Sequence, residues 1–162
     1  MSDSDSLTKV HIDLPHHWAT GGEALWALDL GGHRYRLENV PFYAYDLNLY
    51  DVVEARAASA DLKPSVLRVL ERSGHSTLRV FFGEKNSEEE CLARLRSLGD
   101  LHVSFERSGA RYFALDLEPE ASVDAVRARL DDWEREGAIE YETCEARVPG
   151  SFDAAPLEES VE

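Results

Sequence analysis

In the stretch Glu71-Arg72-Ser73-Gly74-His75-Ser76-Thr77-Leu78-Arg79-Val80-Phe81-Phe82, a polar turn leads directly into an alternating strand. Successive side chains of a strand point to opposite faces, so Leu78, Val80 and Phe82 share one face and the residues between them share the other. We expect the aliphatic face to lie in a hydrophobic core. The chain before this stretch and the chain after it have different patterns, which predicts two modules.

The module before the turn has the pattern of a small all-β unit. Gly31-Gly32 predicts a hairpin turn, and Pro41 makes residues 39–46 an irregular connection. Short alternating segments typical of strands occur at residues 10–14, 24–30, 33–38, 51–55 and 65–70. Five short strands without a helical pattern predict a small β-barrel or a curved antiparallel sheet.

The module after the turn alternates strands with helices. Ser87 and Glu90 form a capping box at the start of a helix predicted over 87–98, and Ser122 can cap a second helix over 122–136. Strands are predicted at residues 76–83, 101–105, 112–117 and 139–143. The order βαββαβ is the ferredoxin-like signature. The predicted fold class is therefore α+β, with the small β-barrel or curved sheet followed by a ferredoxin-like unit.

These patterns divide the chain into four parts. Residues 1–8 are polar and predicted to be disordered, residues 9–75 form the small β module, and residues 76–146 form the ferredoxin-like module. Residues 147–162 combine proline and glycine with a run of acids, which predicts a disordered acidic tail.

The charge of the chain excludes several kinds of partner. The formal net charge is −15 at pH 7, and residues 83–162 carry −12 of it, from 9 Lys and Arg against 21 Asp and Glu. A phosphate backbone or an anionic membrane attracts basic patches, so we expect neither a nucleic acid nor a membrane as partner. A basic or neutral protein partner fits this charge, and the oligomeric state is left open.

The sequence favours the cytoplasm and predicts neither a cofactor nor a metal. Cys91 and Cys144 lack CxxC spacing and lie in apolar patterns, which indicates core residues in a reducing compartment. The first residues lack the basic and apolar regions of a signal peptide, and no window is long and apolar enough to span a membrane. His16 and His17 point apart as neighbours in a strand or loop, so they do not predict a metal site.

The turn between the modules is the strongest candidate for a ligand site. Its candidate residues are Arg72, Ser73, Gly74, His75, Ser76 and Thr77. Glycine lets a ligand approach the backbone, while histidine and hydroxyl groups offer proton transfer and hydrogen bonds. The alternative is a structural turn in which these side chains bond to the backbone. Adjacency in sequence does not assemble a nucleophile and a base, so we assign no catalytic residue.

Two further groups of residues are candidates for partner binding. Tyr43 and Tyr45 lie in the connection that Pro41 interrupts, which we expect to be exposed on one side, and tyrosine is favoured in interfaces. The second predicted helix carries an acidic face, which is either a docking face or a solvated one: Asp131, Asp132, Glu134 and Glu136. Trp26 and Trp133 fall at periodic apolar positions and are predicted to be core residues.

Four motifs occur along the chain in a fixed order. They are Glu23-Ala24-Leu25-Trp26-Ala27, Tyr35-Arg36-Leu37-Glu38-Asn39-Val40-Pro41-Phe42-Tyr43-Ala44, Asp51-Val52-Val53-Glu54-Ala55 and Ser73-Gly74-His75-Ser76-Thr77-Leu78-Arg79. Together they resemble a family of uncharacterised bacterial proteins that is classed as a domain of unknown function. The resemblance covers residues 8–146 and implies a bacterial cytoplasmic protein. It brings no activity and no catalytic residues to this sequence.

Three functions are open from the sequence. The preferred hypothesis is a non-enzymatic binding protein, such as an immunity or antidote protein that covers a basic partner with its acidic second module. The second is a regulatory module that binds a small ligand, by analogy with ferredoxin-like regulatory domains. The third is an enzyme that uses His75, although no paired carboxylates, metal-ligand spacing or phosphate loop accompany it in the sequence.

Overall fold

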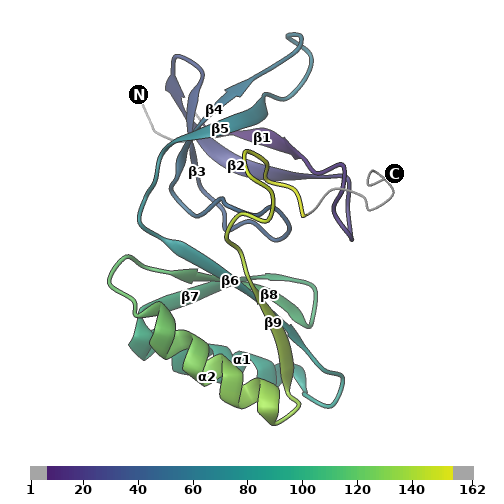
Figure 1. The fold of residues 1–162 in the computed structure, drawn as a ribbon, viewed down its shortest axis with the longest axis vertical. Helices are drawn as coiled ribbons and strands as arrows, with labels where there is room; N and C mark the ends of the chain where they lie inside the picture. Colours follow the sequence, from purple (N-terminus) through teal and green to yellow (C-terminus); the bar gives the residue numbers. More distant parts are fainter. Residues whose placement is uncertain (1–6, 155–162) are drawn as a thin grey trace. The chain divides into compact units, whose positions relative to one another are not determined.

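The computed structural model describes residues 7–154, which form two compact units. Within the described residues, unit 1 consists of the chain up to Ser73 together with the chain from Glu145, and unit 2 is Gly74–Cys144. Unit 2 is therefore inserted into the sequence of unit 1 (Figure 1). Residues 1–6 and 155–162, for which disorder was predicted, lie outside the described residues.

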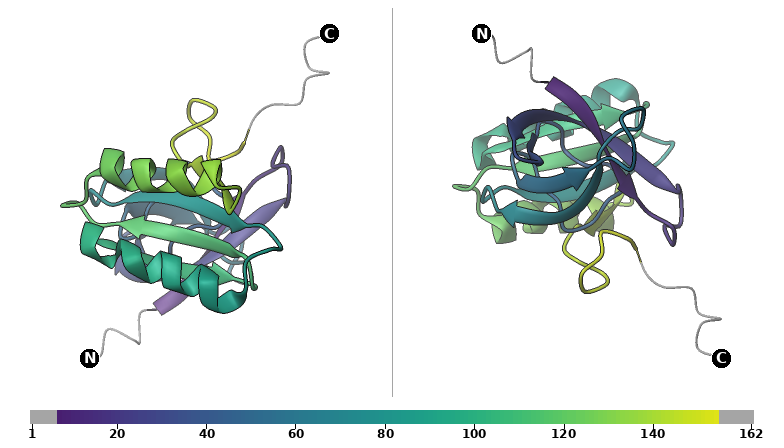
Figure 2. Two further views of the ribbon diagram at one scale, coloured as in Figure 1. Left: turned by 90° about the horizontal axis from the view of Figure 1, so that it is seen from below. Right: turned by 90° about the horizontal axis from the view of Figure 1, so that it is seen from above.

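Unit 1 is a closed five-stranded barrel. Its strands are β1 (Leu7–Asp13), β2 (Gly22–Gly31), β3 (Arg34–Leu37), β4 (Val52–Arg56) and β5 (Ser65–Glu71). Consecutive strands pair antiparallel, and a short parallel pairing of His11 with Ser65 closes the barrel between β1 and β5. The right panel of Figure 2 looks onto these strands. Their alternate side chains fill the interior, as expected for a small barrel.

The interior of the barrel corrects the prediction for Trp26. Leu25 and Ala27 are buried in the core, and the tryptophan between them points outward with 45% of its surface exposed. The ammonium group of Lys9, on β1, lies 5.0 Å from the centre of the Trp26 ring. Successive side chains of a strand point to opposite faces. Because Leu25 and Ala27 point into the barrel, Trp26 must point outward.

The turn between β2 and β3 lies one residue later than predicted. A β-bulge between Asp29 and Gly31 adds a residue to β2, so that Gly32 and His33 form the turn. Their φ angles are 65° and 66°, the left-handed values that a two-residue hairpin turn of type I′ requires. His33 thus takes the left-handed conformation for which the sequence predicted a glycine, in the turn Gly31-Gly32.

The segment from Glu145 to Ala154 folds within unit 1. The N–H of Tyr45 donates to the carbonyl of Phe152 at 2.9 Å, and the N–H of His16 donates to the Asp153 carboxylate at 2.5 Å. The predicted disordered tail therefore does not describe residues 147–154, because their main chain and Asp153 have specific partners in the barrel. At the other end, strand β1 already begins at Leu7, within the range predicted to be disordered.

Unit 2 has the element order βαββαβ that the sequence predicted, and the α+β class is confirmed. All neighbouring strands are antiparallel, in the order β7-β8-β6-β9. Both helices cover one face of this sheet (Figures 1 and 2). The elements are β6 (Ser76–Phe82), α1 (Glu88–Arg96), the short 3₁₀ helix η2 (Ser97–Leu101), β7 (Val103–Ser108), β8 (Tyr112–Leu117), α2 (Val123–Arg135) and β9 (Ile139–Thr143).

The core of unit 2 lies between the sheet and the two helices. Leu78, Val80 and Phe82 face it, as the alternation of β6 predicted. Trp133 of α2 is buried in the same core, which confirms its assignment. Val123, at the first turn of α2, is 39% exposed.

Both helices of unit 2 begin at the predicted cap residues. The Ser87 hydroxyl accepts the N–H of Glu90 at 3.1 Å, and the Glu90 carboxylate accepts the N–H of Ser87 at 2.8 Å, which completes the capping box. The Ser122 hydroxyl accepts the N–H of Ala125 at 3.1 Å. Neither helix, and no other helical segment of residues 7–154, is long and apolar enough to cross a membrane.

Candidate functional site

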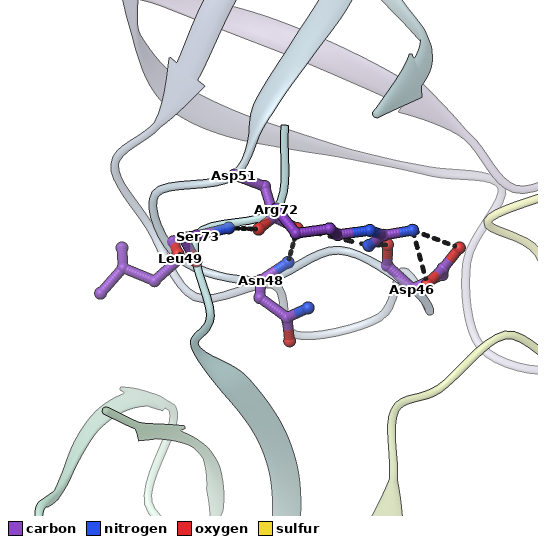
Figure 3. A network of polar contacts seen from close by, with 6 residues as sticks. All are labelled: Asp46, Asn48, Leu49, Asp51, Arg72 and Ser73. Atoms are coloured by element: carbon purple, nitrogen blue, oxygen red, sulfur yellow. Dashed lines mark hydrogen bonds and ion pairs between the residues drawn. The ribbon is translucent and has the colours of Figure 1, made fainter. Parts of the chain in front are cut away.

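The predicted turn is divided between the two units, and its first residues belong to a polar network in unit 1 (Figure 3). The Asp51 carboxylate, immediately before β4, is fully buried and accepts the N–H groups of Asn48 at 3.0 Å and Ser73 at 2.9 Å. The Ser73 hydroxyl donates to the carbonyl of Leu49 at 2.6 Å. A buried carboxylate is tolerated only where donors surround it, so this network fixes the chain after β5 against the loop before β4.

Arg72 extends the network toward the start of the same loop. Its Nη1 donates to the carbonyl of Asp46 at 2.8 Å and lies 3.5 Å from the Asp51 carboxylate. Its Nη2 donates to the Asp46 carboxylate at 3.0 Å. The guanidinium thus joins two carboxylates and one carbonyl of the loop. These contacts of Arg72 and Ser73 are those of the structural turn that the sequence offered as the alternative to a ligand site.

The loop held by this network has a strained backbone. Asp46 and Tyr50 have φ angles of 64° and 69°, in the left-handed region that residues other than glycine rarely adopt. Such conformations cost about 1–3 kcal/mol each and persist only where the surroundings hold them. Arg72 contacts Asp46 directly, and Asp51 binds the intervening N–H of Asn48. Backbone strain of this kind gathers at functional sites, so the loop is a candidate for binding.

A second buried carboxylate holds the first part of the same connection. Glu23, on β2, accepts three consecutive N–H groups, from Phe42 at 2.6 Å, Tyr43 at 3.0 Å and Ala44 at 2.9 Å. Its side chain points into the barrel, on the same face of β2 as Leu25. Side-chain to backbone bonds from Glu23 therefore help to hold the predicted irregular connection.

The rest of the predicted turn belongs to unit 2, where His75 meets a buried acid. The Nδ1 atom of His75 lies 2.8 Å from Asp116 Oδ1, and the Ser104 side chain hydrogen-bonds the same carboxyl group. Burial raises the pKa of the Asp116 carboxyl, and the hydrogen bond with His75 opposes this rise. A histidine oriented by a carboxylate has the geometry of a general base. A nucleophile would have to contact that histidine, whereas Ser104 bonds the carboxyl group of Asp116.

The other turn residues serve the backbone and the sheet. Gly74 has a φ of 93°, so a side chain at this position would be strained. Ser76 and Thr77 begin β6, where Thr77 is buried opposite Asp116 on β8. Within residues 7–154, no three His, Cys, Asp or Glu side chains gather closely enough to hold a metal ion.

The two candidate tyrosines have different environments within unit 1. Tyr45 is buried, contrary to the exposure expected from its sequence context, and the Arg147 guanidinium lies 4.4 Å from its ring centre. Tyr43 is half-buried and packs against the barrel core, with its ring 5.6 Å from that of His17. The neighbouring Trp18, stacked on His17 at 5.2 Å, is 70% exposed. Trp18 and Tyr43 therefore form the accessible part of this aromatic group.

Three of the four candidate acids on the second helix already have partners within unit 2. Glu134 is exposed on α2. Partial neutralisation by neighbouring arginines weakens the field of this surface, and its role in docking stays a prediction. The partners are the Tyr141 hydroxyl for Asp131 at 2.6 Å, Arg135 for Asp132, and Arg94 for Glu136 at 2.9 Å.

The sheet face that carries no helix is also acidic. It bears the alternate residues of β6, which are Thr77, Arg79 and Phe81, and their cross-strand neighbours. Arg79 donates to the Glu142 carboxylate on β9 at 3.0 Å. The charged strand residues of this face are four carboxylates and one guanidinium: Glu106, Asp116, Glu140, Glu142 and Arg79.

Of the three β6 residues on this face, Phe81 is the exposed one. Thr77 and Arg79 are buried, whereas Phe81 is 52% exposed. The cross-strand neighbours of Phe81 are Tyr112 on β8, whose ring centre lies 6.4 Å away, and the exposed Glu140 on β9. The accessible part of the face thus combines aromatic rings with a carboxylate.

The sequence matches one family model, described as a domain of unknown function (DUF4265), over residues 23–141. This is more than half of the chain. The chain belongs to the DUF4265 family. Membership confirms the resemblance inferred from the four motifs.

One solved structure also matches this DUF4265 chain, a hypothetical protein from Neisseria gonorrhoeae. The two are 14% identical over 85% of this chain and 94% of the other, with a TM-score of 0.73. At this identity the likeness shows a shared fold alone. No curated protein matches the chain significantly.

Contacts within unit 1 explain why the DUF4265 motifs occur together. The Glu23 carboxylate of the first motif binds N–H groups of the second, and the Asn39 side chain of the second accepts the N–H of Trp26 at 2.8 Å. Asp51 of the third motif binds the N–H of Ser73 at the start of the fourth. These motif residues therefore act first on the shape of the barrel and its long loop.

Several residues that build these sites were missed in the sequence. Glu23 could have been recognised from the sequence. It alternates with Leu25 and Ala27 on the same face of β2, so its carboxylate lies on the inner face of the strand. Asp51 and Asp116 gave no such signal, since their donors come from residues distant in the chain. Long-range partners of this kind are visible only after folding.

Proposed function

We propose that this protein is a non-enzymatic binding protein that engages a basic protein partner through the acidic surface of unit 2. Unit 2 carries 16 Asp and Glu against 9 Lys and Arg, a net charge of −7. Opposite charge accelerates encounter between proteins and disfavours wrong partners. An immunity or antidote protein of a bacterial cytoplasm is one concrete form of this role.

The observation that carries the proposal is the composition of the helix-free sheet face. Its accessible charged strand residues are the carboxylates of Glu106, Glu140 and Glu142. Asp116 and Arg79 are buried, and the guanidinium of Arg79 is paired with Glu142. A surface of this composition repels phosphate groups and attracts cationic side chains. It therefore supports a basic protein rather than a nucleic acid as the partner.

We further assign unit 2 to the ferredoxin-like arrangement. The strand order β7-β8-β6-β9, the antiparallel pairing and the two helices on one face support this assignment. In this arrangement β6 and β8 are the central strands, and Phe81 is the exposed β6 residue on the face without helices. The analogy concerns architecture, whereas the choice of partner depends on the charges just described.

The proposal is tested by the salt dependence of association with the partner recovered from the native host. We expect that partner to be basic, and we expect the association rate to fall by about tenfold or more between low and physiological ionic strength, where the Debye length shrinks to about 8 Å. Stopped-flow mixing of the two full-length proteins measures this rate. An association rate that does not change with salt would remove the physical basis of the proposal.

A further inference from the structure

Phe81 lies on the central strand β6, on the exposed part of the sheet face that carries no helix. It is 52% exposed, while the neighbouring core residues Val80 and Phe82 are fully buried on the other face. Its ring lies 6.4 Å from that of Tyr112 and is tilted by 47°. The two rings thus form an aromatic pair across β6 and β8, in which Phe81 is half exposed.

The charges beside this pair are negative. Glu140 is the cross-strand neighbour of Phe81 on β9 and is exposed, and Glu106 lies on β7 on the same face. The cationic side chains of Arg79 on β6 and Arg111 just before β8 are engaged in contacts of their own. Arg79 pairs with Glu142, and Arg111 donates to the carbonyls of Gly83 and Asn86 at 2.6 and 3.0 Å.

An aromatic face next to a carboxylate is the environment that favours a cationic side chain. The ring attracts the cation through its quadrupole, and the carboxylate adds a hydrogen-bonded ion pair. Aromatic residues on an open sheet can also stack nucleobases, as in RNA-binding domains of similar architecture. The accessible carboxylates of this face, Glu106, Glu140 and Glu142, oppose that second use, because they repel the phosphates that must accompany a base.

We infer that Phe81, Tyr112 and Glu140 form a subsite for an arginine or lysine side chain of a basic segment in the protein partner. This inference rests on the proposed function and names the partner chemistry and the place where it binds. The cation lies over the ring of Phe81 and pairs with the Glu140 carboxylate. The partner side chain thereby fills the exposed row of the sheet, beyond the ion pair of Arg79 with Glu142.

A short peptide that contains two arginines between glycines, with blocked ends, is the first probe. It is added to the isotope-labelled full-length protein, and amide shifts are followed by NMR. We expect the largest shifts at Phe81, Tyr112 and Glu140, and none of comparable size with a peptide in which neutral citrulline replaces arginine. Equal shifts with citrulline, or shifts spread over the acidic surface, would overturn the inference.

Matched substitutions separate this subsite from general acidity. Phe81→Ala and Glu140→Gln should each weaken peptide binding by roughly two- to fivefold, the effect of losing one exposed cation–π or ion-pair contact. Phe81→Trp should retain binding. Asp61→Asn removes one exposed carboxylate from unit 1, outside the acidic surface of unit 2, and should leave affinity unchanged. Because Phe81 is half exposed, its replacement should preserve the fold, which a urea melt checks.

Two further outcomes distinguish this inference from the proposed function. If association with the native partner depends on salt but not on Phe81 or Glu140, the subsite is wrong and the acidic docking function stands. If a short single-stranded oligonucleotide shifts the same amides more strongly than the arginine peptide does, a nucleic acid is the ligand. In that case both the subsite assignment and the proposed function fail.

Discussion

Unit 1 and unit 2 achieve a folded state by different means. The long connection of unit 1 is held by buried carboxylates, where Glu23 and Asp51 bind backbone N–H groups of residues distant in sequence. Unit 2 is held by an apolar core between sheet and helices, with its helix ends capped by adjacent residues. The difference shows that a barrel with long loops needs polar contacts of long range, whereas a layered sheet and helices need mainly periodic apolar residues.

The largest expected effect comes from separating the two units. Unit 2 is continuous, and its ends lie on β6 and β9, which are paired neighbours. Unit 1 needs the segment from Glu145, which binds the loops of the barrel. We therefore expect residues 74–144 to unfold cooperatively as an isolated fragment and residues 1–73 to lack a folded state. Circular dichroism with thermal melts measures both.

A fusion provides the control for this separation. Joining residues 1–73 to residues 145–162 through a glycine-serine linker should restore a cooperative transition, because it supplies the missing contacts of Phe152 and Asp153. A fragment of residues 1–73 that folds as well as this fusion would show that the returning segment is dispensable. In that case the discontinuity of unit 1 would not affect its stability.

The next effect compares two tryptophans. Trp133→Ala should reduce the free energy of unfolding by about 3–5 kcal/mol, because the ring is buried in the core of unit 2. Trp26→Ala should cost less than about 1 kcal/mol, since this ring lies outside the barrel under Lys9. Urea melts of both variants give the difference. Equal losses would mean that outward aromatic packing matters as much to unit 1 as the core does to unit 2.

This pair also shows where sequence-based prediction succeeds and fails. In α2, Val126, Leu130 and Trp133 recur at helical spacing and polar residues separate them, so one face was defined and Trp133 was placed correctly. In β2, apolar residues occur on both faces of the strand around Leu25 and Trp26. Alternation therefore did not decide which residues face inward. Barrel closure and the inward Glu23 decide it, and both depend on residues far away in the chain.

The candidate site could be predicted only in part for the same reason. Composition and turn chemistry selected the stretch around Ser73 and His75 as a candidate, without indicating its partners. Its partners Asp51 and Asp116 lie 22 and 41 residues away, and no local pattern connects them. The aromatic pair of Phe81 and Tyr112 depends on the register of β6 with β8, which follows from folding of the whole sheet.

An intermediate effect is expected from the carboxylate network of unit 1. Asp51→Asn keeps the size of the side chain but replaces one acceptor oxygen by a donor, beside the N–H groups of Asn48 and Ser73. The expected loss is about 1–3 kcal/mol, the cost of a buried hydrogen-bonding group left without its partner. Asp46→Asn, which alters a partly exposed carboxylate bound by Arg72, should cost at most about 1 kcal/mol. Equal losses of unfolding free energy in urea melts would contradict a polar network centred on the Asp51 carboxylate.

The smallest expected effect lies in the local contacts of unit 2. Ser87→Ala should cost about 1 kcal/mol, because the N–H of Glu90 loses its acceptor at the start of α1. Ser122→Ala removes the corresponding bond at α2. The described side-chain contacts of this cap consist of the hydroxyl bond to Ala125, without the second, carboxylate bond of a capping box. We expect the Ser122 variant to lose no more than the Ser87 variant, and both to lose less than Asp51→Asn. Fragment 74–144 and the full chain should give the same loss for Ser87→Ala, since the cap contacts only its own helix. A cap variant that cost as much as Trp133→Ala would show that local contacts matter as much as the apolar core to the stability of unit 2.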